Sequence, residues 1–299
     1  MAIRLGIAPI GWTNDDLPEL GGDITLERCL TEAKAAGFGG VERGGKFPSD
    51  PAVLGPILQE HGLALVSGWF SGRLLDGSVE EEKARIRSQL DLYLAMGCPV
   101  MVYAETTGTV QGMIDTPVSA RPVLEDDAIR AYGEKLTHLA DWLKAEGCPL
   151  TFHHHMGTVI EKEREVDLLM ENSGDSVGLL LDTGHLTFAG GDVPATTRRW
   201  GKRINHVHVK DVREGVLARL RAEDGSFLKG VLEGVFTVPG DGTIDFRAFM
   251  RVVKEIGYAG WVVVEAEQDP AKANPSAMAR IGHDELKAAC RDAGIVIAA

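Results

Sequence analysis

Histidine and carboxylate side chains recur in this chain directly after short apolar runs. His206 and His208 are separated by one residue, and so are Glu265 and Glu267. In an extended strand, residues two apart share a face, so both members of each pair must point the same way. Carboxylates and imidazoles together suit a divalent cation of intermediate hardness. We expect Mn²⁺ or Co²⁺ first, with Zn²⁺ and Fe²⁺ as alternatives.

Six of the apolar runs end in residues of this kind. The ends carry Glu42 and Lys46; Glu105; His153, His154 and His155; Asp182 and His185; His206, His208 and Lys210; Glu265 and Glu267. A single aspartate after an apolar run is more often a helix cap than a ligand. The alternative for the whole set is that each residue merely caps its own strand end. That interpretation requires many carboxylates and imidazoles to meet at one site by accident, so we favour a metal site. Side chains alternate between the two faces of a strand, so at most two of the three rings in the His153–His155 run can point into this metal site.

The apolar runs themselves predict eight strands, which begin near residues 3, 39, 63, 99, 149, 177, 204 and 261. Between them, helical spacing predicts helices over 26–36, 78–96, 126–146 and 246–256, each followed by a glycine. Alternating strands and helices over 299 residues predict an α/β fold: one (β/α)8 TIM barrel over 1–299, with an insertion at about 212–241 after strand seven. In such a barrel, the carboxyl ends of the strands carry the chemistry.

An open, doubly wound sheet is the alternative fold. It would require a glycine-rich phosphate fingerprint or a crevice where the strand order reverses. No G-x-G-x-x-G opens a predicted helix, and glycine pairs such as Gly190-Gly191 are typical of loops. There is also no Pro/Ser-rich linker. The barrel therefore remains the favoured prediction.

The charge balance limits the partners. The chain has 31 Lys+Arg and 44 Asp+Glu, a formal net charge of −13. This charge disfavours nucleic acids and anionic membranes, which bind clustered cations, and it is compatible with a homo-oligomer. No apolar run approaches the roughly 20 residues needed to span a bilayer, and the N-terminus lacks the apolar core of a signal peptide. Four scattered cysteines predict reduced thiols in a cytoplasmic protein.

Seven stretches spread over nearly the whole chain resemble the xylose-isomerase-like, sugar-phosphate isomerase/epimerase superfamily of metal-dependent TIM barrels. They are GIAPIGWTNDDLPELGG (6–22), GVERGGKFP (40–48), FHHHMGT (152–158), LLLDTGHL (179–186), INHVHVKDVR (204–213), GVFTVPGDGTIDF (234–246) and WVVVEAEQDP (261–270). The first and sixth stretches are similar to the inosose dehydratase group of myo-inositol catabolism. DxxH and HxxD, on strands six and seven, are shared more widely in the superfamily.

The resemblance implies one divalent metal held by residues from strands five to eight. Asp182, His208 and Glu265 carry over directly. Many relatives have a glutamate at the end of strand five, where this chain has His153, so the fourth ligand is either His153 or Glu161. We favour Glu161, because another carboxylate better neutralises a hard divalent ion. The alternative for Glu161 is an acid in the first turn of a helix, stabilised by the helix dipole.

The resemblance further implies a hydro-lyase that removes water from 2-keto-myo-inositol (scyllo-inosose), a small neutral cyclic polyol ketone, to give a trihydroxycyclohexane-dione. A metal serves as Lewis acid and template for removal of the proton beside the ketone. A base and an acid complete the reaction; the candidates for these roles are His153, His155, Glu105 and Lys210. Candidates for binding hydroxyls are Glu42, Lys46, His185 and Arg213, with structural ion pairs as the competing interpretation. The resemblance also implies a thiol reductant such as glutathione.

Three other functions fit the same fold. A keto-sugar isomerase or epimerase would share the metal and the acid/base pair and differ only in the fate of the enolate. An apurinic endonuclease would need a cationic groove, which a net charge of −13 disfavours. A sugar-binding barrel without catalysis would retain the pocket but not the turnover.

Overall fold

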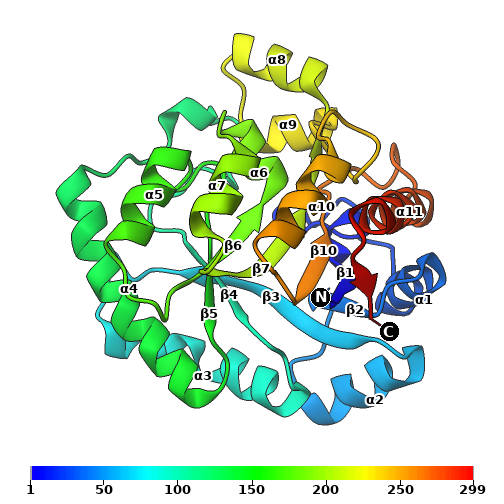
Figure 1. Cartoon of the computed structure of the whole chain (residues 1–299), viewed down its shortest axis with the longest axis horizontal. Helices are drawn as coiled ribbons and strands as arrows, with labels where there is room; N and C mark the ends of the chain where they lie inside the picture. Colours follow the sequence, from blue (N-terminus) through cyan, green and yellow to red (C-terminus); the bar gives the residue numbers. More distant parts are fainter. Residues whose placement is uncertain (1, 299) are drawn as a thin grey trace.

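Eight parallel strands close into a barrel at the centre of the molecule (Figure 1). The computed structural model describes residues 2–298. The barrel strands are β1 (Ala2–Ile7), β2 (Gly40–Arg43), β3 (Ala64–Gly72), β4 (Met101–Glu105), β5 (Leu150–His153), β6 (Gly178–Asp182), β7 (Ile204–Val209) and β10 (Trp261–Val264). The ring is closed by β10 against β1, with Leu5 opposite Val262. The eight predicted strands and the TIM-barrel fold are confirmed.

Helices surround the strands (Figure 1). They are α1 (Leu26–Ala36), α2 (Pro51–His61), α3 (Val79–Met96), α4 (Asp126–Glu146), α5 (Glu163–Glu171), α6 (Thr183–Phe188), α7 (Val193–Trp200), α10 (Phe246–Glu255) and α11 (Pro275–Ala293), with short 3₁₀ turns η1 (Pro9–Gly11) and η2 (Val118–Ala120). The predicted helix 78–96 begins one residue later, because Ser78 caps it by accepting the N–H of Glu81. No helix within residues 2–298 has the length and apolar character to cross a membrane.

The barrel interior changes from apolar to polar along its axis. Ala8, Val66, Trp261 and Val263 form a small apolar cluster inside it. Gly40 makes room for this cluster, because a Cβ there would lie 2.3 Å from Val66 and 2.9 Å from Trp261. The buried histidine and carboxylate side chains lie nearer the carboxyl ends of the strands. The packing thus seals one end of the barrel and leaves the other for a polar site.

The segment predicted as an insertion carries two helices that lie at the edge of the molecule, at the top of Figure 1. It contains β8 (Asp211–Val212), α8 (Glu214–Ala222), α9 (Phe227–Glu233) and β9 (Phe236–Thr237), and β8 pairs with β9 antiparallel. Its apolar side chains form a buried cluster around Phe227 and Phe236, which also includes Leu17, Met156 and Phe188 from the barrel loops and α6. At the C-terminus, β11 (Val296–Ile297) pairs with β1. The division into a single domain with an insertion stays a prediction.

Candidate metal centre

Four buried side chains meet at the carboxyl ends of successive strands: His153 on β5, Asp182 on β6, His208 on β7 and Glu265 just after β10. Nδ1 of His208 lies 3.6 Å from Oδ2 of Asp182 and 2.9 Å from Oε2 of Glu265. Nε2 of His153 lies 3.8 Å from Oδ2 of Asp182. Ligands about 2.1 Å from a tetrahedral ion lie roughly 3.4 Å apart. The spacing therefore suits one divalent cation.

The hydrogen bonds around these four residues also fit a cation. Oδ2 of Asp182, Nδ1 of His208 and Oε2 of Glu265 are buried without a hydrogen-bond partner. A buried polar atom without a partner is costly, and one cation would satisfy all three. Nδ1 of His153 lies 2.6 Å from the carbonyl oxygen of His154. The proton of His153 therefore sits on Nδ1, and Nε2 presents its lone pair to the site.

Glu42 lies behind this centre and orients His208. Its Oε1 is 2.9 Å from Nε2 of His208 and 3.1 Å from Nε2 of His206, and the hydroxyl of Ser67 also donates to it. A carboxylate bound to one nitrogen of a histidine fixes the lone pair of the other on the metal. Glu42 was predicted to bind substrate hydroxyls. The structure instead uses both rings of strand β7 to hold its carboxylate inside the barrel.

The pKa shifts of these residues reflect burial and the carboxylates around them. Burial lowers the pKa of His153 well below its usual range, so its ring is neutral and can act as a ligand. Burial acts the same way on His208, but the carboxylates of Glu42 and Glu265 outweigh it and hold the pKa of His208 well above its usual range. The pKa of Glu265 is depressed, because Lys210 and His208 outweigh the effect of burial. The carboxylates thus create a strongly negative field at this point.

Glu161, our favoured fourth ligand, lies elsewhere. Its Oε1 is 3.3 Å from Nε of Arg121, and its Oε2 accepts the N–H of Gly157 at 2.8 Å. Arg121 also pairs with Glu165, 2.5 Å away. These contacts hold Glu161 away from the other three ligands. His153, the alternative fourth ligand, is the residue that stands beside them.

A cavity of about 100 Å³ opens from the centre towards solvent. It is lined by Ile10, Asp15, Asp16, Trp69, Gln111, His155, Glu265 and Glu267. Nδ1 of His155 lies 2.9 Å from the carbonyl oxygen of Met156, and its Nε2 lies 3.8 Å from Oε1 of Glu267. As alternation predicts, His154 points away, and its Nε2 faces the backbone N–H of Asp182. His155 thus presents a proton-accepting nitrogen on the cavity side.

Lys210 is completely buried beside this cavity. Its ammonium donates to Oε2 of Glu267 at 2.7 Å and to Nε2 of His185 at 2.9 Å, and it lies 3.2 Å from Oε2 of Glu265. Burial disfavours the charge, but Glu265 and Glu267 outweigh it and raise the pKa of Lys210 above its usual range. His155, His185 and Glu267 form a second histidine–carboxylate group, and the ammonium of Lys210 is the cation beside it. The ammonium also occupies Nε2 of His185, which was predicted to bind substrate.

Three more predicted site residues make structural contacts instead. The ammonium of Lys46 donates to backbone carbonyls of the loop after β1, including Gly22 at 2.9 Å. Arg213 donates to the carbonyl oxygen of Gly234 at 2.7 Å and pairs with Asp241, which closes the insertion. Glu105 accepts the N–H groups of Leu75 and Thr107 at 3.2 and 3.0 Å and lies outside the cavity lining. For Arg213, the competing interpretation as a structural ion pair matches this geometry, whereas Lys46 bonds backbone carbonyls and, within residues 2–298, forms no such pair.

Sequence reasoning missed two residues on the loops after β1 and β4 and one residue within β3. Asp16 and Gln111 line the cavity, and Trp69 packs edge-on against His153 and His155, with ring centroids 5.6 and 5.2 Å apart. The site residues expected from the sequence lie at six strand ends, and the ends of strands one and three are not among them. The Asn14-Asp15-Asp16 run directly after strand one was the available signal for Asp16.

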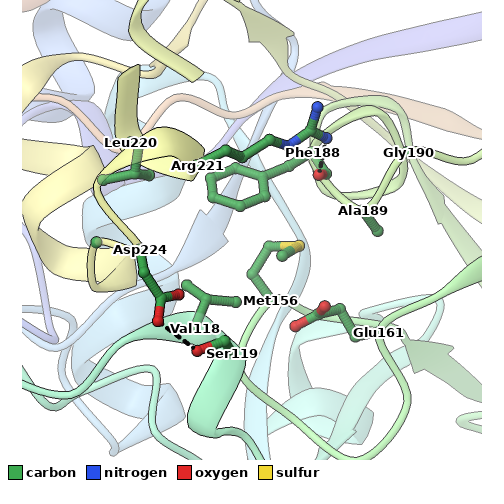
Figure 2. A pocket seen from close by; sticks show the side chains of 11 residues that line it. Val118, Ser119, Met156, Glu161, Phe188, Ala189, Gly190, Leu220, Arg221 and Asp224 are labelled. Atoms are coloured by element: carbon green, nitrogen blue, oxygen red, sulfur yellow. Dashed lines mark hydrogen bonds between the residues drawn. The ribbon is translucent and has the colours of Figure 1, made fainter. Parts of the chain in front are cut away.

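A larger cavity, of about 490 Å³, lies between the insertion and the loop after β5 (Figure 2). Met156, Phe188 and Leu220 form its apolar walls, and Glu161 and Asp224 project from its sides. Asp224 accepts a hydrogen bond from Ser119 at 2.8 Å. None of the four converging residues lines this cavity. The candidate metal centre therefore faces the smaller cavity and not this one.

Comparison with known proteins agrees with the fold. Residues 30–289 match the family described as xylose isomerase-like TIM barrel. The chain is 49% identical to the rhizopine catabolism protein MocC of Rhizobium meliloti, over 98% of this chain and 90% of that protein. It is 44% identical to an inosose dehydratase of Geobacillus thermodenitrificans (strain NG80-2), over 96% and 97%. A solved structure of the IOLI protein with a binding zinc atom shares the fold, with a TM-score of 0.66, 18% identity and 97% and 98% coverage.

Proposed function

The chain belongs to the xylose isomerase-like TIM barrel family, and we propose that it catalyses the dehydration of inosose in inositol catabolism. The observation that carries this proposal is the convergence of His153, Asp182, His208 and Glu265 at the barrel mouth, in a chain 44% identical to an inosose dehydratase over nearly its whole length. The reaction makes it a carbon–oxygen lyase. Its product is a trihydroxycyclohexane-dione.

The difficult step is removal of a proton beside a ketone. A bound divalent cation supplies Lewis-acid stabilisation of the charge that develops at the ketone oxygen. His153, Asp182, His208 and Glu265 would hold this cation, with Glu42 fixing the ring of His208. Because the centre is buried, the field of these groups acts in a medium of low effective dielectric constant.

His155 is the residue we propose as the base. Its Nε2 faces the cavity, because Nδ1 is bonded to the carbonyl oxygen of Met156. Positioned acid/base groups typically contribute about 10²–10⁴-fold to a rate. His153 is proposed as a ligand rather than a base, and Lys210 as a positioning residue for Glu265 and Glu267. Glu105 has no role at the reacting atoms in this proposal, since two backbone N–H groups hold its carboxylate.

The donor set of two imidazoles and two carboxylates supports a divalent metal, and we propose Mn²⁺ or Co²⁺. Zinc is the alternative, because a structural neighbour is described with it. The substrate is a neutral polyol, so nucleic acids and membranes have no place in the proposal. The four buried free thiols favour the cytoplasm. The thiol reductant and the homo-oligomer stay predictions.

A role in rhizopine catabolism is a second candidate, since the identity to the MocC protein, 49%, exceeds the 44% to the dehydratase. The test is to incubate the metal-loaded protein with scyllo-inosose and, separately, with a rhizopine. Release of one water from inosose supports the dehydratase. A product of unchanged mass would support an isomerase or epimerase instead. Turnover of the rhizopine alone would favour the second candidate.

A further inference from the structure

The loop after β1, residues 8–25, is fastened to the loop that follows β2. Both carboxylate oxygens of Asp15 accept the N–H of Gly45, at 3.1 and 2.9 Å. The approach is so close that a Cβ at Gly45 would lie 2.6 Å from Oδ1 of Asp15. Oδ1 of Asn14 accepts the N–H groups of Asp16 and Leu17, at 2.8 and 3.0 Å. These bonds fix the backbone on both sides of Asp16.

The far end of the same loop is also held. The ammonium of Lys46 donates to the carbonyl oxygens of Gly21, Gly22 and Ile24. At the near end, Trp12 is buried, and its Nε1 donates to Glu32 at 2.7 Å. The loop is therefore anchored on both sides of Asp16. An ordered loop can present a polar side chain at low entropic cost to binding.

The carboxylate of Asp16 takes no part in this fastening and lines the cavity. Asp16 is exposed, whereas His155 and Glu267 of the same cavity lining are buried, so Asp16 marks the outer rim of the cavity. Gln111, from the loop after β4, also lines it. Glu265 belongs to the metal centre, so the cavity runs from that centre to Asp16. A cyclic polyol bound at the metal centre would direct the hydroxyls that do not contact the centre towards this rim.

We propose that Asp16 binds a ring hydroxyl of the substrate, so that Asp16 and the metal centre together set the orientation of the ring. An ionised carboxylate only accepts hydrogen bonds, and a neutral polyol offers hydroxyl donors around its ring. Such a charge-assisted bond is roughly twice as strong as a neutral one. The inference rests on the proposed function in one respect, namely that the ligand is a cyclic polyol.

The first test compares Asp16→Asn with Asp23→Asn, an exposed aspartate of the same loop. With scyllo-inosose and Mn²⁺, we expect the KM of Asp16→Asn to rise about 10- to 100-fold while kcat changes far less. The affinity for Mn²⁺ and the unfolding temperature should match the wild type, which excludes a folding defect. Asp23→Asn should behave like the wild type. An unchanged KM in Asp16→Asn overturns the inference.

The second test does not depend on dehydration. Calorimetry measures binding of myo-inositol to the Mn²⁺-loaded protein and to Asp16→Asn. If the wild type binds myo-inositol without dehydrating inosose, and the variant loses affinity, the proposed function fails and the role of Asp16 stands. If the wild type binds neither compound, or the variant binds as tightly as the wild type, the role of Asp16 is refuted.

Discussion

Nε2 of His208 lies 2.9 Å from Oε1 of Glu42, and this bond turns Nδ1 of the same ring towards Asp182 and Glu265. The carboxylate of Glu42 sits inside the barrel, and Nδ1 of His208 faces the barrel mouth. This is the arrangement by which proteins fix the tautomer of a metal-binding histidine and raise its basicity. In the proposed metal centre, Glu42 would therefore orient His208 from inside the barrel.

Replacing Glu42 by Gln should weaken metal binding by about 10- to 100-fold, the usual effect of losing such a partner. Competition with a chelator for Mn²⁺ measures the change. Glu105→Gln is the matched control, since Glu105 is equally buried at a strand end but bonds only backbone N–H groups. Equal Mn²⁺ affinity in Glu42→Gln and the wild type would show that Glu42 does not orient a ligand.

The fourth ligand can be decided by two variants. His153→Ala should lose most of its Mn²⁺ affinity, because it removes one of four converging donors. Glu161→Gln should keep the metal, since Glu161 bonds Arg121 and Gly157 instead. Metal content after dialysis distinguishes them. The reverse pattern would restore Glu161 as the ligand favoured by the sequence.

Lys210→Met tests the buried ammonium. Removing it leaves the carboxylates of Glu265 and Glu267 close together without their cation, and breaking a buried ion pair costs about 3–5 kcal/mol. Urea unfolding of the metal-free protein should show a loss of this order. Lys229→Met, which removes an exposed ion pair with Glu223, serves as the control and should change stability little. A stable Lys210→Met protein would mean that the carboxylates are not held by the ammonium.

Lys46→Ala should raise the KM for inosose by loosening the loop that presents Asp16, because three backbone carbonyls lose their donor. Lys46→Arg should restore part of the affinity. If Lys46 acts only through Asp16, adding Lys46→Ala to Asp16→Asn should raise KM little further. Fully additive effects in the double variant would point to a direct contact between Lys46 and substrate.

The elements of the fold were accessible from the sequence because their signals are local. Helix α4 covers 126–146 as predicted, since apolar spacing marks its buried face and Gly147, at a φ of 96°, marks its end. The face shared by His206 and His208 likewise follows from the alternation of a strand, and both rings do reach Glu42. Periodicity of this kind needs no knowledge of the tertiary structure.

The partners of individual polar groups could not be derived in the same way. Glu161, the fourth ligand favoured from the sequence, forms an ion pair with Arg121, 40 residues earlier in the sequence. Lys46 and Arg213 were assigned to substrate, yet each satisfies carbonyl groups of a distant loop. These bonds join segments that are distant in the sequence and meet only in the folded protein, so residue type and strand position cannot reveal them.

The most direct test of the account is the metal dependence of dehydration. The protein is stripped with a chelator, Mn²⁺ or Co²⁺ is restored, and scyllo-inosose is followed by ultraviolet absorbance and product mass. We predict no turnover by the stripped protein. After metal is restored, we expect a conjugated dione lighter than the substrate by one water. Dehydration that continues at full rate without metal, or a restored protein that yields only an isomer of unchanged mass, would contradict it.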